Sequence, residues 1–204
     1  MVHQYKLNGY NIVLDTCSGS IHVVDEIAYD IIELFPKKEA DEIVAEGGVA
    51  MAYKCNCLDK ADIEAVHEKV LADFGKCDIL VNGAGGNNPR ATTDKEYFEL
   101  GDIDADTKSF FDLDADGVGF VFNLNFLGTL IPTQAFARQM VGREGCNILN
   151  ISSMNAYTPL TKIPAYSAAK AGISNFTQWL ATHFAGTGIR CNAIAPGFLL
   201  SAQN

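Results

Sequence analysis

From residue 47 onward, short apolar runs alternate with longer segments in which apolar positions recur at helical spacing. The apolar runs predict strands over 49–56, 77–86, 146–153 and 189–197. The intervening patterns predict helices over 60–75, 120–141 and 165–185. Strands that alternate with helices are typical of a parallel sheet covered by helices. We therefore expect an α/β fold for this part of the chain.

Residues 1–35 follow a different pattern. Asn8-Gly9 stands between two apolar-rich stretches and Ser18-Gly19 can turn a further strand, so the segment predicts a β-hairpin followed by a helix. Two antiparallel turns in quick succession leave no room for the dozen or more residues that a parallel crossover needs. Residues 36–46 could form a helix that belongs to either side. We expect a hairpin-and-helix segment over 1–35, a junction over 36–46 and an α/β domain over 47–204.

Composition and charge narrow the possible partners. The chain has 204 residues, 48% of them hydrophobic, and a net charge of −10, which suits a folded domain and disfavours nucleic acid as a ligand. No run approaches the roughly 18 to 20 apolar residues of a membrane span, and the start lacks a secretory pattern. The six cysteines show no zinc or CxxC spacing, so we expect no metal site. We expect a soluble, cytoplasmic protein with no nucleic acid or membrane partner.

The strongest chemical signal is the run YSAAK, which places Tyr166 four residues before Lys170 on a predicted helix. This spacing brings both side chains to one helix face, where the ammonium favours the ionised form of the phenol. Such a tyrosine can act as a general acid or base near neutral pH.

Three further features should converge on the same edge of the sheet. Ser153 ends a predicted strand, Asn125 lies in the preceding helix, and Pro196-Gly197 follows the last strand. The carboxyl ends of parallel strands are where open α/β sheets bind ligands. Each residue also has a purely structural interpretation, as a cap, a buried amide or turn punctuation. Five coincidences of type, order and spacing favour the chemical interpretation.

These residues resemble the short-chain dehydrogenase/reductase family. The matching motifs, in order over roughly residues 42–204, are NGAG at 82–85, Asn125 with Gly128, Ser153, Tyr166 with Lys170, and PG at 196–197. Within that family, the segments NGAGGNNPRATTD and NISSMNAYTPLTKIPAYSAAKAGISNFTQWL look most like the D-mannonate oxidoreductases (fructuronate reductases). The resemblance implies a Rossmann-like, doubly wound parallel sheet. It also implies a nicotinamide cofactor, NAD or NADP, a small-molecule sugar acid as substrate, and a homo-oligomer.

Carried over to this chain, the family resemblance implies four catalytic residues. Tyr166 would be the proton donor and acceptor, and Lys170 would favour its ionised form and contact the nicotinamide ribose. Ser153 would hold the substrate carbonyl, and Asn125 would support a water that relays protons.

The resemblance also implies a set of cofactor-binding residues. Apart from Tyr166 and Lys170, these are Asn56, Asn82, Gly83, Ala84, Gly85, Pro196 and Gly197. Small residues would allow the backbone to approach the cofactor closely. Asn56 stands where the family commonly has an aspartate facing the adenine, so that contact differs from the family pattern.

Polar residues on loops leaving the same sheet edge are candidates for binding the sugar acid. They are Asn87, Asn88, Arg90, Asn155 and Lys162. A carboxylated, hydroxylated substrate needs amide donors and a cation. The alternative is that they are solvated loop residues.

The run DLDADG at 112–117 has the acids and the glycine of a calcium loop, but position 12 of that loop would be Asn123 rather than glutamate. We expect instead an acidic cluster at the start of a helix, where the helix dipole favours negative charge.

The family's phosphate-binding glycine loop has no counterpart in this chain. Aligning Thr16 with the family's threonine puts Cys17, Ile21 and Val23 where glycines belong, and 20–25 reads as a strand where a helix should begin. The resemblance also places the first two strands of the sheet between those at 49–56 and 77–86, and the C-terminal end of the fold is not reached.

Residues 1–35 resemble instead the N-terminus of the radical SAM enzymes that mature six-cysteine (SCIFF) peptides, without their CxxxCxxC cluster motif. Two functions therefore remain open: a mannonate-type oxidoreductase, inactive if the truncation removes cofactor binding, or a peptide-binding segment fused to a non-catalytic dehydrogenase remnant. A chimera of two coding fragments would account for both.

Overall fold

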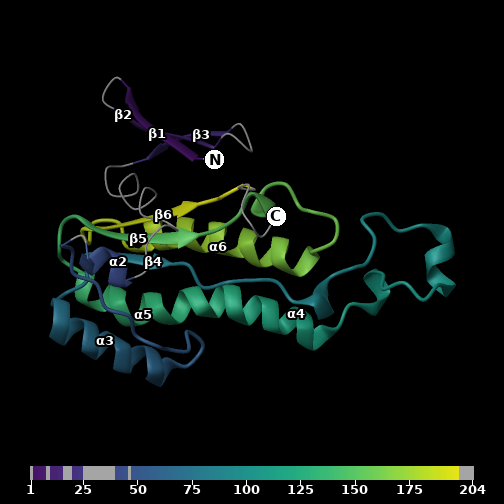
Figure 1. The fold of residues 1–204 in the computed structure, drawn as a ribbon, viewed down its shortest axis with the longest axis horizontal. Coiled ribbons are helices and arrows are strands. Elements are labelled where there is room, and N and C mark those ends of the chain that lie inside the picture. Colours follow the sequence, from purple (N-terminus) through teal and green to yellow (C-terminus); the bar gives the residue numbers. More distant parts are fainter. Residues whose placement is uncertain (1, 8–9, 16–19, 25–39, 46, 198–204) are drawn as a thin grey trace. The chain divides into compact units, whose positions relative to one another are not determined.

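The computed structural model describes residues 2–7, 10–15, 20–24, 40–45 and 47–197 (Figure 1). These residues form two compact units that divide between Lys54 and Cys55, with Pro196 as the last residue of the second unit and Gly197 assigned to the first. This division falls later in the chain than the junction expected at 36–46. The three-part domain organisation remains a prediction.

The first unit contains an antiparallel sheet of strands β1 (Val2–Leu7), β2 (Tyr10–Asp15) and β3 (Ser20–Val24). The strands follow one another in the order β1-β2-β3, with Tyr5 opposite Ile12 and Ile12 opposite Val23. The expected hairpin pairing is confirmed. Helix α2 (Ala40–Ala45) occupies part of the junction. The two turn sequences and the helix expected before residue 36 lie outside the described residues.

The strand expected over 49–56 is not formed. These residues have no regular secondary structure, and Val49 is 77% exposed. A β-strand is held by hydrogen bonds to a neighbouring strand, and no described strand pairs with this segment. The apolar run therefore lacks the partner that would make it part of a sheet.

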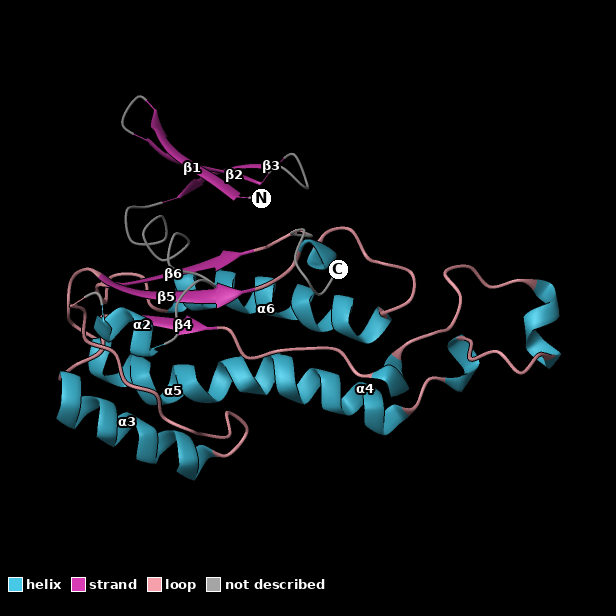
Figure 2. Cartoon of the chain, in the orientation of Figure 1, coloured by secondary structure: helices cyan, strands magenta, loops and turns pink. Residues whose placement is uncertain are grey.

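The second unit contains the parallel sheet (Figure 2). Its strands are β4 (Ile79–Asn82), β5 (Cys146–Ile151) and β6 (Ile189–Ile194), in the order β4-β5-β6. Leu80 lies opposite Ile148, and Ile148 opposite Cys191. Because β2 belongs to the other sheet, it does not fill the position beside β4, whose outer edge has no partner among the described strands.

Helices pack on this parallel sheet. They are α3 (Lys60–Phe74), α4 (Ala115–Phe122), α5 (Gly128–Met140) and α6 (Pro164–His183). Helix α5 contacts β4 and β5, α6 contacts β5 and β6, and α3 packs against α5. The π-helical turn η4 (Asn123–Leu127) joins α4 to α5 without a break. The α/β fold with a parallel sheet is confirmed.

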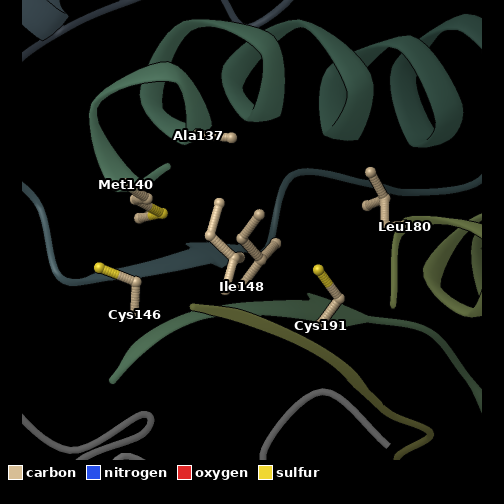
Figure 3. Packing of buried hydrophobic residues seen from close by; sticks show 7 residues of the cluster. Ala137, Met140, Cys146, Ile148, Leu180 and Cys191 are labelled. Carbon is tan, nitrogen blue, oxygen red and sulfur yellow. The ribbon is translucent and has the colours of Figure 1, made fainter. Parts of the chain in front are cut away.

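The main hydrophobic core lies between the sheet and helices α5 and α6 (Figure 3). Met140 and Ile148 are completely buried there, and Leu180 comes from α6. Burial of large aliphatic side chains is the dominant stabilising contribution to such a unit. Among the described helices, none is long and apolar enough to span a bilayer.

Residues 93–113 form a projection that we call the arm. It follows the short helix η1 (Pro89–Ala91) and ends before α4, and it contains the single turns η2 (Leu100–Asp104) and η3 (Phe110–Asp112). In Figure 2 the arm extends away from the sheet and from the helices that cover it.

Candidate active site

Helix α6 positions the tyrosine and the lysine. Pro164 occupies its first turn, where a missing backbone N–H costs nothing. Lys170 is only 3% exposed; its Nζ lies 5.6 Å from the centre of the Tyr166 ring and donates a 2.8 Å hydrogen bond to the carbonyl oxygen of Ile151. The ammonium is thus held between the end of β5 and the face of the tyrosine.

Burial lowers the pKa of Lys170 from 10.5 to about 8, because the charged form loses hydration. Of the three N–H groups of the ammonium, one has an acceptor among the described residues, the Ile151 carbonyl. Two donors of a buried cation therefore remain for oxygen atoms of a ligand or of water.

Ser153 follows directly after β5 and begins the short helix η5 (Met154–Ala156). Its Oγ accepts a 3.2 Å hydrogen bond from the backbone N–H of Asn155. A hydroxyl that accepts at its oxygen keeps its own proton for another acceptor. The neighbouring Ser152 turns into the core, where its Oγ lies 2.7 Å from that of Ser174. At the end of β5, Ser152 is therefore bonded within the core, whereas the hydroxyl proton of Ser153 remains available to a ligand.

Asn125 lies in the π-helical turn and is completely buried. Its Nδ2 donates to the carbonyl oxygens of Gly86, at 2.7 Å, and Val121, at 2.8 Å, while its Oδ1 accepts from the N–H of Gly86 at 3.2 Å. The amide therefore clamps the loop after β4 to the helix. Sequence reasoning missed Gly86, although the second glycine of the GG pair after NGA was a signal for it.

Gly85 lies between the two central polar groups. A methyl group added at this position would be 2.6 Å from Oδ1 of Asn125 and 3.1 Å from Nζ of Lys170. Both of those atoms are already held by hydrogen bonds, to Gly86 and Ile151 respectively. This explains why the loop needs glycine here.

The predicted cofactor residues of the NGAG run differ in their exposure. Gly83 and Gly85 are exposed and Ala84 is half-buried, whereas the Asn82 amide points into the core, donating to Thr133 at 2.9 Å and to Asn150 at 2.8 Å. Asn82 thus holds β4 rather than presenting its side chain to a ligand.

The end of β6 lies near η5, because the Pro196 carbonyl accepts from the N–H of Met154 at 3.0 Å. Gly197 belongs to the other unit. Asn56 is exposed at the approach to α3, and its Oδ1 accepts from the N–H of Leu58 at 3.0 Å. The role of Pro196, Gly197 and Asn56 in cofactor binding therefore remains a prediction.

Three of the five predicted substrate residues have local structural partners. The Nδ2 of Asn87 donates to Thr92, the Oδ1 of Asn88 caps η1, and Arg90 forms an ion pair with Asp114 at 2.7 Å. An arginine already facing a carboxylate is less suited to a second one.

The remaining two have unused bonding capacity. Asn155 is 5% exposed, and its Oδ1 has no hydrogen-bond partner among the described residues. Lys162 is half-buried, and its carbonyl accepts from the N–H of Thr93, which fixes its backbone. No ion pair to its ammonium is found among the described residues.

The DLDADG run begins helix α4. Asp114 is the N-cap, with Oδ1 accepting from the N–H of Gly117, and Asp112 closes a capping box with Ser109. The helix-start interpretation is confirmed. Within the described ranges, no group of three metal-ligating side chains comes together.

Comparison with known proteins gives consistent results. The family model described as short chain dehydrogenase matches residues 24–204, so the match begins earlier in the chain than residue 42. An uncharacterized oxidoreductase of Haemophilus influenzae is 64% identical over 167 residues, and one of Bacillus subtilis is 50% identical over 163 residues. They cover 82% and 80% of this chain, which spans 58% of each relative.

A solved structure is similar over the same region. A Haemophilus influenzae protein with bound NAD, for which D-mannonate oxidoreductase activity has been proposed, superposes with a TM-score of 0.78 at 59% identity. The match covers 88% of this chain and 61% of that one. These comparisons lend no support to the second resemblance, that of residues 1–35 to peptide maturases.

Proposed function

Because the chain belongs to the short-chain dehydrogenase family, we propose that it is part of an NAD(P)-dependent oxidoreductase that interconverts a sugar-acid alcohol and its ketone, of the D-mannonate and D-fructuronate type. The observation that carries the proposal is the buried ammonium of Lys170, held 5.6 Å from the Tyr166 ring with one acceptor among the residues that the structure describes. A buried cation with unused donors is costly unless a ligand or water completes it.

The residues at this edge suit the nicotinamide half of a dinucleotide. Lys170 has two N–H donors for the hydroxyls of a ribose, and the exposed backbone at Gly83 and Gly85 allows close approach. When bound, the cofactor supplies or accepts the hydride. The NAD present in the Haemophilus influenzae structure supports this assignment.

The protein's own groups would handle the proton. During reduction, the Tyr166 hydroxyl donates its proton to the oxygen of the reacting carbonyl, and during oxidation the phenolate accepts it back. The Lys170 ammonium stabilises that phenolate. The Ser153 hydroxyl, whose oxygen accepts from Asn155, donates to the same carbonyl oxygen and polarises it.

Two residues would recognise the sugar acid. The Lys162 ammonium, with no ion pair among the described residues, would bind the carboxylate. The Asn155 Oδ1, a buried acceptor with no donor in the described part of the chain, would accept from a substrate hydroxyl. Arg90 is the weaker choice because Asp114 already occupies its guanidinium.

Cofactor binding is the first test. Titration of the purified chain with NADH and with NADPH, followed by fluorescence, should show saturable binding to one of them, and fructuronate should then be reduced. Lys170→Met should weaken binding at least tenfold, whereas Lys69→Met, at an exposed site on α3, should not. Silence with both cofactors would contradict the proposal and favour the non-catalytic remnant.

Turnover then tests the chemical roles. Tyr166→Phe should lower kcat by at least a hundredfold while cofactor binding stays within a few-fold, since only the proton transfer is lost. Tyr157→Phe, at a tyrosine that is 69% exposed, is the matched control and should keep full activity.

Substrate recognition has its own test. Lys162→Met should raise KM for fructuronate about tenfold or more with little change in kcat, because a carboxylate contact is present in both ground and transition states. An unchanged KM would remove Lys162 from the site and leave the proton chemistry unaffected.

A further inference from the structure

The peptide group that joins Ile151 to Ser152, at the end of β5, is bonded on both of its sides. Its N–H donates to the Ile194 carbonyl of β6 at 2.7 Å, and its carbonyl accepts from Nζ of Lys170 at 2.8 Å. The two groups of a trans peptide point in opposite directions, so this carbonyl faces away from β6. The pairing of β5 with β4 ends one residue earlier. The ammonium of Lys170 therefore bonds a strand carbonyl just beyond the point where β4 stops.

The side chain of Ser152 holds the other end of the same lysine. Its buried Oγ donates to the backbone carbonyl of Lys170 at 3.1 Å and lies 2.7 Å from Oγ of Ser174. Ser174 also donates to that carbonyl at 3.3 Å, a bond to the residue four positions earlier that serine commonly makes within a helix. The Ser152 bond differs, because it joins a strand to a helix. The end of β5 therefore holds Lys170 at its ammonium and at its main chain.

Holding both ends matters because lysine has a long side chain. Four methylene groups separate the ammonium from the main chain and give it large conformational freedom. An ammonium fixed by one bond alone could therefore be reached from several main-chain positions. With the Lys170 carbonyl bonded to Ser152 and Nζ bonded to Ile151, both bonds come from adjacent residues of one strand. The two bonds together set the level of α6 along β5, and with it the 5.6 Å between Nζ and the Tyr166 ring.

We propose that Ser152 is a positioning residue of the candidate active site. It acts through Lys170, by fixing α6 at the level along β5 at which the ammonium lies against Tyr166. Because the next residue is Ser153, the same strand end also sets where the Ser153 hydroxyl lies relative to that ammonium. The positioning itself requires no particular substrate, whereas its effect on turnover rests on the proposed function.

Thr177 provides a matched control on the same helix. Its Oγ1 accepts from the side-chain amide of Asn150 at 2.9 Å and donates to the Ile173 carbonyl at 2.8 Å. It therefore joins α6 to β5 through a buried hydroxyl, as Ser152 does, but it does not bond Lys170. Ser152→Ala and Thr177→Val each remove one such hydroxyl, so we expect similar losses of thermal stability. A purely structural role of Ser152 predicts that the two variants also behave alike at the site.

Carbon NMR of the chain labelled at its lysine side chains reports on Lys170 without any turnover. The Lys170 signal, identified by its loss in Lys170→Met, should titrate near the lowered pKa of about 8 in the wild type. In Ser152→Ala the ammonium should gain hydration, and the midpoint should rise by about half a pH unit or more. In Thr177→Val the midpoint should stay at the wild-type value. An unchanged midpoint in Ser152→Ala, or an equal rise in both variants, would overturn the proposal.

Fructuronate reduction gives the second readout. Ser152→Ala should lower kcat about tenfold, because proton transfer depends on correctly placed groups, while KM for fructuronate stays within about twofold. Thr177→Val should keep both constants near those of the wild type. A raised KM with an unchanged kcat in Ser152→Ala would contradict the positioning role.

The two readouts separate this inference from the proposed function. A chain that binds neither NADH nor NADPH contradicts the proposed function, and the NMR midpoints then decide the role of Ser152. A rise confined to Ser152→Ala supports that role, and any other pattern overturns it. A chain that reduces fructuronate with equal kcat in wild type and Ser152→Ala keeps the proposed function and overturns the positioning role.

Discussion

The candidate active-site edge of the parallel sheet and the arm differ in which side chains they bury. At the edge, polar groups are buried and bonded: Asn125 is completely buried and holds Gly86 at both its N–H and its carbonyl. In the arm, apolar groups are exposed and the polar groups form the frame, as with Lys95 and Asp102. Burial of polar groups fixes reactive atoms, whereas exposure of apolar groups offers a surface to another molecule.

The two regions also differ in how far their bonds reach along the chain. The edge joins distant residues, since Asn82 bonds to Asn150 across two strands. The arm joins near neighbours, as in the capping box of Ser109 and Asp112. The edge therefore depends on the whole sheet, and the arm depends mostly on itself.

The largest difference between the two regions should appear when a glycine in each is replaced by alanine. Gly85→Ala places a methyl group 2.6 Å from Oδ1 of Asn125, and we expect loss of activity by a hundredfold or more. Gly101→Ala in the arm meets nothing within 4 Å and should leave turnover unchanged. Steady-state kinetics of both variants test this, and equal activity of the two would show that the tight loop is not required.

The next largest effect should be the loss of stability when a buried polar side chain at the edge is removed. The Asn150 amide accepts from Asn82 and donates to Thr177 at 2.9 Å. Asn150→Ala removes both bonds in a fully buried place, so we expect the free energy of unfolding to fall by about 2–4 kcal/mol.

The matched change in the arm is Ile103→Ser, at a side chain that is 67% exposed. We expect it to cost less than about 0.5 kcal/mol. Urea denaturation of both variants measures the difference, and similar costs would contradict the distinction between the regions.

The stability contributed by the buried Lys170 at the edge should depend on pH. The pKa of Lys170 is lowered from 10.5 to about 8 by burial, so between these values the unfolded chain binds more protons and the stability gained from this residue rises with pH. Lys170→Met should be more stable than wild type at pH 7, with the advantage shrinking by on the order of 1–2 kcal/mol by pH 9.5.

Urea denaturation of both proteins at the two pH values provides the measurement. Burial raises the pKa of Cys191 to about 11, which lowers stability as pH rises, but this contribution is common to both proteins and cancels in the difference. An advantage that does not change with pH would contradict the buried cation.

The smallest effect concerns the frame of the arm. The hydrogen bond from Lys95 lowers the pKa of Asp102, so this contribution is present at neutral pH and is lost as pH falls through the lowered value. Lys95→Met should reduce stability only slightly, because an ion pair in contact with solvent contributes little, and should speed amide hydrogen exchange within residues 99–105. Faster exchange in β5 instead would mean that the arm supports the sheet.

Sequence reasoning succeeded where a structural relation depends on local spacing. The i to i+4 relation of Tyr166 and Lys170, and the helix start at Asp114, follow from helix geometry alone. It failed where a residue's partner is distant. The apolar run at 49–56 forms no strand, because strand formation needs a neighbour that the run itself cannot specify.

The same limit applies to the site. Arg90 has the right charge for a substrate carboxylate, yet its guanidinium already forms an ion pair with the carboxylate of Asp114. Asn82 carries a family motif, but its amide serves the core. Side-chain type indicates what a residue can do, and only the fold decides which partner it meets.

The π-helical turn has a consequence for helix phase. The buried positions Gly117, Val121, Asn125, Thr129 and Thr133 recur at every fourth residue. In an uninterrupted α-helix each such step rotates the face by about 40°, so four steps would carry it nearly to the opposite side.

The wider turn at Asn123–Leu127 takes up an extra residue and reverses part of that rotation. It lets Asn125 reach the loop after β4 while Thr133, two steps on, still meets Asn82. Deleting one residue from this turn would convert it to an ordinary α-helical turn and leave α5 near its present phase relative to α4. The π-helical turn therefore keeps the buried faces of α4 and α5 in line along the whole helical segment.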